Sequence, residues 1–360
     1  DALKHNGLRL CVDLVLNHIG VTSRLAQSRP DFFDHDPERP DGFKRAGAVD
    51  GEHWVSWEDL ARLNYEAPEP AVRRALWDTM LSYAKFWTAY AAETGGFIRL
   101  DNLHSTHESF LAYLLHELRR DWPELPVFCE FFAAEEVVLR LSWKYGLSLC
   151  LATPWTAPYA YQVRGQLRWL HQQQAVPYLF PLASHDSGAP AQEYGGVEAT
   201  TARYVTAALF STGQTGAVQG NEDGHPVKLP FIGKPAPLVW PENPALREVF
   251  RRVNRLHASS PVFRQADNLR FVDGDHGALV GALRWHGAER FLLLANLDPR
   301  GTHTVLIRRS QLAAGMDPQP ESRPLHLEER LAEGGFDWTE EAHSFTLGPA
   351  AALVYEIKLK

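Results

Sequence analysis

The sequence predicts an α/β fold, either a barrel or a doubly wound sheet, followed by an antiparallel β domain. Short, continuous apolar runs alternate with longer amphipathic stretches through the first two thirds of the chain. Unbroken apolar runs are typical of parallel strands that helices cover on the outside. Near residues 259–268 the pattern changes to short alternating segments. The strands expected in the first part are residues 8–16, 96–101, 126–132, 147–152, 178–184 and 216–220.

Helices are expected between these strands. Residues 69–93 and 109–120 carry apolar side chains near helical spacing, so each predicts an amphipathic helix. Repeated strand–helix units of this kind favour an α/β architecture. Residues 19–65 do not fit the rhythm, because they are rich in Pro, Asp, Gly and aromatic residues. We expect them to form an irregular excursion after the first strand, and long irregular loops in compact domains usually serve function.

The last hundred residues are expected to form the antiparallel β domain. Turn dipeptides such as Asp273-Gly274 and His286-Gly287 separate some of the alternating segments, as in β-hairpins. The expected strands are residues 269–272, 278–285, 291–297, 302–307 and 351–357.

Composition excludes several classes of partner. The 360 residues include 36 Lys and Arg against 44 Asp and Glu, which gives a formal net charge of −8. Binding to nucleic acid or to an anionic membrane needs clustered cations, and no basic stripe is present, so neither partner is expected. No apolar stretch approaches the roughly 18 residues of a membrane span. The 11 Trp and 11 Tyr could stack on sugar faces or pack in a core, and the oligomeric state is left open.

The cysteines Cys11, Cys129 and Cys150 lie far apart in the sequence, each within an apolar run. An odd number without metal-ligand spacing indicates small buried side chains in a reducing compartment, and not a disulfide framework or a zinc site. We therefore expect a cytoplasmic protein, and no spacing of His, Asp and Glu residues indicates a catalytic metal.

Polar side chains end several of the apolar strands, which is the most informative pattern in the sequence. In a β/α barrel, catalytic groups lie at the carboxyl ends of several strands. Burying a carboxylate there costs several kcal/mol unless it is paired or reactive. The residues concerned are Asp13, Asn17 and His18 at the first strand, Arg99 and Asp101 at the second, Glu130 at the third, and His185 and Asp186 at the fifth.

Arg99 and Asp101 are two residues apart, so on a strand they point to the same side. A guanidinium there would keep Asp101 ionised, as a nucleophile requires, whereas the apolar residues before Glu130 would help it retain the proton of a general acid. One nucleophilic and one acidic carboxyl, about 5–5.5 Å apart, are the apparatus of a retaining glycosidase. The alternative is a structural Arg99–Asp101 ion pair and a solvated Glu130.

These stretches resemble the signature regions of the α-amylase family, glycoside hydrolase family 13. Residues 13–18 (DLVLNH) match its first region and residues 96–101 (GFIRLD) its second, while residues 127–130 (VFCE) and 183–186 (ASHD) resemble the third and fourth. Residues 213–222 resemble its eighth-strand signature, with Thr215 where proline is usual. The resemblance implies a (β/α)8 TIM-type barrel over residues 1–260, with an inserted loop or subdomain at 19–65 and a C-terminal β-sandwich at 261–360. About six of the eight strand–helix units can be placed, so the first two would precede Asp1.

The resemblance also implies roles for single residues. Asp101 would be the nucleophile, Glu130 the general acid/base, and Asp186 the third carboxylate that binds sugar hydroxyls. His18 and His185 would hydrogen-bond the sugar, and Arg99 would position Asp101. The family's chemistry needs no cofactor. A structural calcium ion is doubtful, because Ser105 replaces the histidine whose carbonyl commonly binds it, although Asn17 is available as a ligand.

His104 and Ser105 depart from typical amylases, which carry a lysine and a histidine there. The run Asp101-Asn-Leu-His-Ser resembles the 4-α-glucanotransferase part of glycogen debranching enzymes and, more loosely, the maltosyltransferases that act on maltose 1-phosphate. His104 would then contact substrate, or it packs at the strand end. The expected function is a retaining hydrolase or transglycosylase acting on an α-glucan or maltooligosaccharide. The alternatives are a 4-α-glucanotransferase or maltosyltransferase, and a non-catalytic carbohydrate-binding relative or inactive fragment.

Overall fold

The computed structural model describes residues 1–50, 53–173, 176–228, 239–313 and 324–360. The chain divides into two compact units, Asp1–Leu151 and Ala152–Lys360, and each is described by itself. The predicted boundary between residues 260 and 261 stays a prediction. None of the helices in the described ranges is long and apolar enough to cross a membrane.

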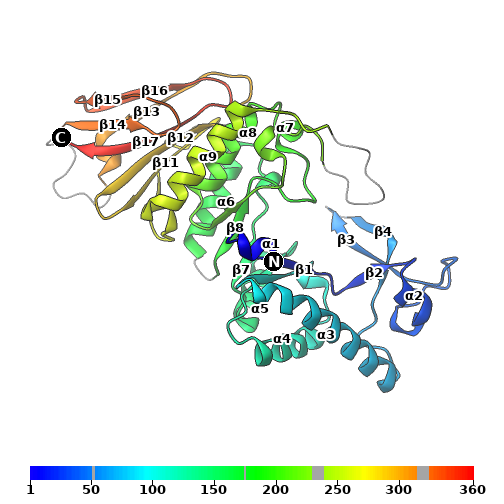
Figure 1. Ribbon diagram of the computed structural model, residues 1–360. Coiled ribbons are helices and arrows are strands. Elements are labelled where there is room, and N and C mark those ends of the chain that lie inside the picture. The colour runs from blue at the N-terminus through cyan, green and yellow to red at the C-terminus, as the bar shows by residue number, and fades with distance from the viewer. Residues whose placement is uncertain (51–52, 174–175, 229–238, 314–323) are drawn as a thin grey trace. The chain divides into compact units, whose positions relative to one another are not determined.

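The first unit is built on a parallel sheet with strand order β1-β5-β6-β7, and Figure 1 shows the helices that connect these strands. The strands are β1 (Cys11–Leu14), β5 (Phe97–Leu100), β6 (Val127–Cys129) and β7 (Leu149–Leu151). The main helices are α3 (Pro70–Glu93), α4 (Glu108–Asp121) and α5 (Glu135–Tyr145), and short helices α1 (Ala2–His5) and α2 (Arg24–Ser28) precede them. Each predicted strand of this unit is present in shortened form, and the predicted helices match α3 and α4 within two residues.

The inserted segment is more regular than the sequence predicts. It forms an antiparallel sheet in the order β2-β4-β3, from β2 (His18–Gly20), β3 (Arg45–Asp50) and β4 (His53–Arg62). Gly47 makes the close pairing possible, because a Cβ at this position would lie 2.3 Å from the carbonyl oxygen of Val55. The prediction of an irregular excursion was wrong here, because polar residues and glycine hide the strand pattern.

The second unit begins with a parallel pair, β8 (Tyr178–Pro181) and β9 (Gln214–Gly216). Its helices are α6 (Ala160–Gln173), α7 (Pro190–Glu193), α8 (Ala199–Val205) with the π-helical turn Thr206–Phe210, and α9 (Pro244–Ser259). The strand predicted at residues 216–220 lies earlier in the structure, at β9. Gly220 has a φ of 95° and belongs to a turn, so an extended strand cannot continue through it.

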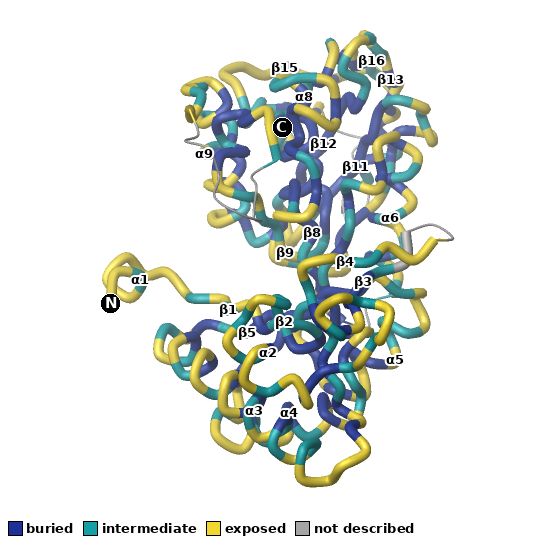
Figure 2. Tube along the Cα trace, turned by 90° about the vertical axis from the view of Figure 1, so that its right-hand side faces the viewer, coloured by how far each residue is buried: buried dark blue, intermediate teal, exposed yellow. Residues whose placement is uncertain are grey.

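The antiparallel sheet of the second unit has strand order β10-β11-β12-β17-β14-β15, and β13 pairs separately with β16. Phe291 and Leu293 of β12 pack in one apolar cluster and Leu292 and Leu294 in another, so this strand is buried on both faces. Figure 2 shows the resulting run of buried residues. Strands β14, β15 and β16 were missed in the sequence. The bounds are β10 (Leu269–Phe271), β11 (Leu279–His286), β12 (Glu289–Asn296), β13 (His303–Arg308), β14 (Leu325–Glu329), β15 (Gly335–Trp338), β16 (Ala342–Leu347) and β17 (Ala352–Leu359).

The prediction of free, buried cysteines is confirmed for two of the three and was wrong for Cys11. Cys129 and Cys150, distant in sequence, are register partners on the neighbouring strands β6 and β7, and both are free and buried. Burial raises the pKa of the Cys129 thiol well above its usual value. Cys11 is exposed, because β1 is the first strand in its sheet order and pairs only with β5 among the described strands.

Candidate functional site

The carboxyl ends of β1, β5 and β6 bring acidic side chains to one edge of the parallel sheet. Asp13 of β1 and Arg99 of β5 are register partners, so their side chains start from neighbouring positions. Asp101 follows β5 directly, and Glu130 follows β6. Because parallel strands end at the same edge, residues distant in sequence are placed around one point.

Arg99 lies at the centre of this group. Its Nη1 atom contacts Asp101 Oδ1 at 3.0 Å and also forms a hydrogen bond with Asp13, while Nη2 lies 2.6 Å from Glu130 Oε1. Burial by itself lowers the pKa of Arg99, but its hydrogen bond to Asp13 and the charges of Glu130, Asp13 and Asp101 outweigh burial and raise the pKa. The guanidinium is therefore permanently charged and holds the carboxylates around it.

One guanidinium separates the carboxyls of Asp101 and Glu130. Their separation is bounded by the two contact lengths and the width of the guanidinium between them. The spacing in the sequence predicts a pairing of Arg99 with Asp101 alone, whereas the structure adds Glu130 and Asp13 as partners. This arrangement is a geometry in which one carboxyl can attack and the other can exchange a proton.

Glu130 lies in a less apolar setting than the sequence predicts. Only 3% of its side chain is exposed, and Arg99 contacts one carboxyl oxygen. The other oxygen accepts a 3.3 Å hydrogen bond from the main-chain N–H of Asn102. Asn102 has a φ of 43°, a left-handed conformation that asparagine tolerates better than most residues, and this turn aims its N–H at Glu130. The sequence patterns did not identify Asn102, although an asparagine just beyond the end of a strand favours such a turn.

The two histidines predicted for this unit both lie within electrostatic reach of Asp101. The ring of His18 contacts the edge of Trp57, with 5.3 Å between ring centroids, and His104 Nδ1 accepts a 3.4 Å hydrogen bond from the N–H of Phe132. Burial lowers the pKa of His18 and of His104, and the charge of Asp101 opposes this shift in both cases. Both imidazoles are therefore neutral at pH 7 and can hydrogen-bond a hydroxyl group.

Asn17 is buried between β1 and the inserted sheet. Its main-chain carbonyl accepts a hydrogen bond from Leu63 N–H at 3.1 Å, and its side-chain oxygen has no hydrogen-bond partner in the described part of the chain. Within that part, no group of His, Cys, Asp and Glu side chains has the arrangement of a metal site. The role of Asn17 as a substrate or calcium ligand stays a prediction.

These histidines predict a pH dependence of stability. Since the folded-state pKa values lie below the ordinary value of 6.5, the unfolded chain binds more protons as the pH falls through 6.5. The free energy of unfolding should therefore decrease below about pH 6.5. Urea denaturation between pH 8 and pH 5 measures this, and a double His18→Gln/His104→Gln variant should show a smaller decrease. An equal decrease in that variant would exclude these histidines as the cause.

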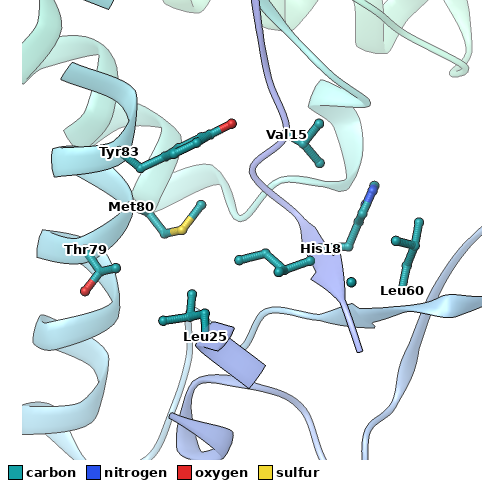
Figure 3. A pocket seen from close by; sticks show the side chains of 9 residues that line it. Val15, His18, Leu25, Leu60, Thr79, Met80 and Tyr83 are labelled. Carbon is teal, nitrogen blue, oxygen red and sulfur yellow. The ribbon is translucent and has the colours of Figure 1, made fainter. Parts of the chain in front are cut away.

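An apolar cavity of about 510 Å³ adjoins His18. Figure 3 shows Met80 and Tyr83 of α3 on one side of it, Leu60 of β4 on the other, and His18 between them. Apart from His18, Thr79 and Tyr83, its walls offer little that could bind a hydroxyl group. The polar chemistry of the first unit is therefore concentrated around Arg99.

His185 and Asp186 belong to the second unit, in the loop between β8 and α7. Their side chains pair with each other, with His185 Nε2 3.1 Å from Asp186 Oδ2, and are 51% and 40% exposed. Ser184 Oγ accepts a 3.1 Å hydrogen bond from Asp186 N–H, and Lys228 Nζ donates to the carbonyl oxygen of Asp186 at 2.6 Å. The convergence of Asp186 with Asp101 and Glu130 stays a prediction.

Comparison with known proteins gives a consistent set of relatives. No family model matches the chain. The α-1,4-glucan:maltose-1-phosphate maltosyltransferase of Salinibacter ruber is 26% identical over 95% of this chain, which corresponds to 51% of the relative. The enzyme of the same name from Methylacidiphilum infernorum is 23% identical over 84% of this chain and 46% of the relative. These relatives support the predicted resemblance to the α-amylase family.

Solved structures give the α-amylase fold independently. The α-amylase of Geobacillus thermoleovorans superimposes with a TM-score of 0.71 over 98% of this chain and 78% of its own, at 15% identity. The trehalose-6-phosphate hydrolase of Bacillus licheniformis gives 0.69 over 98% and 84%, at 13% identity. The predicted fold class is confirmed: the parallel strand–helix units form part of a β/α barrel and an antiparallel β domain follows. The chain spans about half the length of the curated relatives it matches.

Proposed function

We propose that this chain carries the catalytic residues of a retaining enzyme that transfers a maltosyl group from maltose 1-phosphate to the end of an α-glucan. The observation that carries the proposal is the Arg99 guanidinium, which holds Asp101 at 3.0 Å and Glu130 at 2.6 Å. The names of the relatives supply the substrates, since they are maltosyltransferases acting on these compounds.

In the first step Asp101 attacks the anomeric carbon of the maltosyl group while the bond to the phosphate oxygen breaks. Asp101 becomes a covalent β-glycosyl ester, and phosphate leaves with the electron pair and with the proton of Glu130. Arg99 holds and orients the carboxylate of Asp101 for the attack. His18 and His104, neutral at pH 7, would bind hydroxyl groups of the sugar beside Asp101.

In the second step a sugar hydroxyl at the glucan end attacks the ester. Glu130, now ionised, accepts the proton of that hydroxyl, and Asp101 departs as a carboxylate, so two inversions retain the α configuration. Asp186 of the second unit is the proposed third carboxylate, which binds sugar hydroxyls together with His185. The reaction needs no cofactor.

Hydrolysis, the other outcome of the same intermediate, differs only in the acceptor. The run at Asp101–Ser105, which departs from amylases and resembles transferases, favours a sugar over water. The purified protein should therefore be incubated with maltose 1-phosphate, with and without maltoheptaose, while free phosphate, chain length and reducing ends are measured.

Transfer predicts phosphate release that depends on maltoheptaose, with products that grow by two glucose units and no new reducing ends. Release of maltose without an acceptor would overturn transfer in favour of hydrolysis. Redistribution of maltoheptaose without donor would indicate a 4-α-glucanotransferase. No reaction under any condition would overturn the enzymatic proposal and favour a carbohydrate-binding relative.

A further inference from the structure

A second hollow lies within the Ala152–Lys360 unit and has no part in the proposed chemistry. Its volume is about 650 Å³, within the range of small-ligand sites. Its walls are formed by the start of α6, the residues after α7, the loop before β11 and the loop after β12. It shares no lining residue with the smaller hollow beside His185.

A buried cation lines this hollow. Arg203 is only 7% exposed, donates to the carbonyl oxygen of Ala157 at 2.9 Å and to that of Pro158, and lies 3.9 Å above the ring of Tyr194. Its hydrogen bonds within the described part of the chain go to these main-chain carbonyls and not to a carboxylate, and burial lowers its pKa. A guanidinium has more N–H donors than these two carbonyls occupy, so Arg203 can also donate to acceptor oxygens of a ligand in the hollow.

The mouth of the hollow carries both a hydrogen-bond acceptor and a hydrogen-bond donor. Glu193 and Arg300 line it, are exposed, and form no ion pair within the ranges that the structure covers. Asp298, a further lining residue, is held by His303 Nε2 at 2.7 Å. A carboxylate accepts from hydroxyl groups and a guanidinium donates to them, so this rim suits a neutral polyhydroxylated ligand better than an ion of either sign.

Aromatic faces adjoin this polar rim. Tyr159 lines the hollow just before α6, and Tyr161 lies in the first turn of α6. The two side chains are 60% and 59% exposed, and their ring planes differ by only 6° with centroids 5.9 Å apart. Exposed parallel rings are surfaces on which the C–H faces of pyranose rings can stack, and a tyrosine keeps its hydroxyl group available for hydrogen bonding.

We propose that the hollow and the Tyr159–Tyr161 pair form a second carbohydrate site that holds part of an α-glucan chain through ring stacking and hydroxyl contacts. The proposal rests on the proposed function for its ligand class. Its residues all belong to one unit, and none of them is among the catalytic or sugar-binding residues assigned above. The site would retain a polymeric acceptor without taking part in bond cleavage.

The test uses affinity electrophoresis of the full chain in gels that contain glycogen, which measures binding without turnover. The Tyr159→Ala/Tyr161→Ala variant should bind glycogen at least about tenfold more weakly. Tyr90→Ala, which removes an exposed tyrosine of α3, is the matched control and should bind like the wild type. Glu193→Gln/Arg300→Ala, which changes only exposed side chains at the rim, should also weaken binding.

Kinetics separate this site from the catalytic one. With glycogen as acceptor, KM should rise about fivefold or more in the tyrosine variant, whereas kcat with maltotriose should stay within about twofold of wild type. The second site is overturned if the Tyr159→Ala/Tyr161→Ala variant binds glycogen as tightly as Tyr90→Ala does. It is also overturned if the wild type does not bind glycogen. If the proposed function is wrong, the wild type will show no maltosyl transfer. The electrophoresis measures glycogen binding without turnover, so it still tests the second site in that case.

Discussion

Replacing Asp101 by asparagine is expected to reduce maltosyl transfer at least about 10³-fold while the protein stays folded. An amide cannot form the glycosyl ester, so the first step has no nucleophile. Arg99 keeps its contacts with Asp13 and Glu130 in the variant, so the buried guanidinium remains paired. The measurements are the rate of phosphate release from maltose 1-phosphate and the thermal unfolding midpoint.

Asp78→Asn is the matched control, because Asp78 is half exposed on α3 and pairs only with Arg74 among the described residues. It should transfer at the wild-type rate. Glu130→Gln should lose about 10²–10⁴-fold with maltose 1-phosphate, and less with maltosyl fluoride, whose leaving group needs no proton. With the fluoride, an adduct of one maltosyl group should be detected on Asp101 by mass spectrometry. Wild-type turnover in Asp101→Asn would reject this residue as the nucleophile.

Replacing Arg284 by methionine is expected to lower the free energy of unfolding by at least about 3 kcal/mol. Arg284 of β11 is fully buried, and burial lowers its pKa to about 9, which leaves it protonated at neutral pH. Its five N–H donors reach five oxygen acceptors, so methionine of similar length would leave all of these acceptors without that donor. They are Asn268 Oδ1 and the carbonyl oxygens of Leu209, Ser211, Val262 and Gln265, at 2.6–3.2 Å.

Urea denaturation measures the effect of Arg284→Met. Arg270→Met on the neighbouring strand β10 is the control, because Arg270 is exposed, and it should change stability by no more than about 0.5 kcal/mol. Arg284→Lys keeps the charge but has fewer N–H donors, all on one nitrogen. Its loss in the free energy of unfolding should therefore lie between the losses of Arg270→Met and Arg284→Met. A loss below about 1 kcal/mol for Arg284→Met would show that the acceptors find other partners.

The sequence predicted the strand–helix order well where the physical signal is local. Residues 69–93 form α3 almost to the residue, because apolar spacing and the proline at the helix start are both visible in the chain. The inserted sheet and β14–β16 were missed, since short strands with polar or glycine residues are defined by their partners. Gly47 on β3 illustrates this, because its meaning depends on the carbonyl of Val55 across the sheet.

The candidate site shows the same division between local and long-range information. The pairing of Arg99 with Asp101 follows from a spacing of two on a strand and was predicted. The contacts of Arg99 with Glu130 and Asp13 depend on how three parallel strands are aligned, which no local pattern contains. The hydrogen bond from Asn102 to Glu130 depends on a left-handed turn that only the structure displays.

The neighbouring thiols of Cys129 on β6 and Cys150 on β7 can be used to measure local opening of the parallel sheet. Cys129 immediately precedes Glu130, and both Cys129 and Cys150 are buried. A thiol reagent can therefore modify either side chain only after strands β6 and β7 separate locally. The labelling rate would measure how often the strand that precedes Glu130, the proposed acid/base residue, opens locally. Exposed Cys11 would be labelled without opening of the strands and would serve as an internal control. If substrate slowed the labelling of Cys129 and Cys150 but not of Cys11, it would stabilise the strand that precedes Glu130.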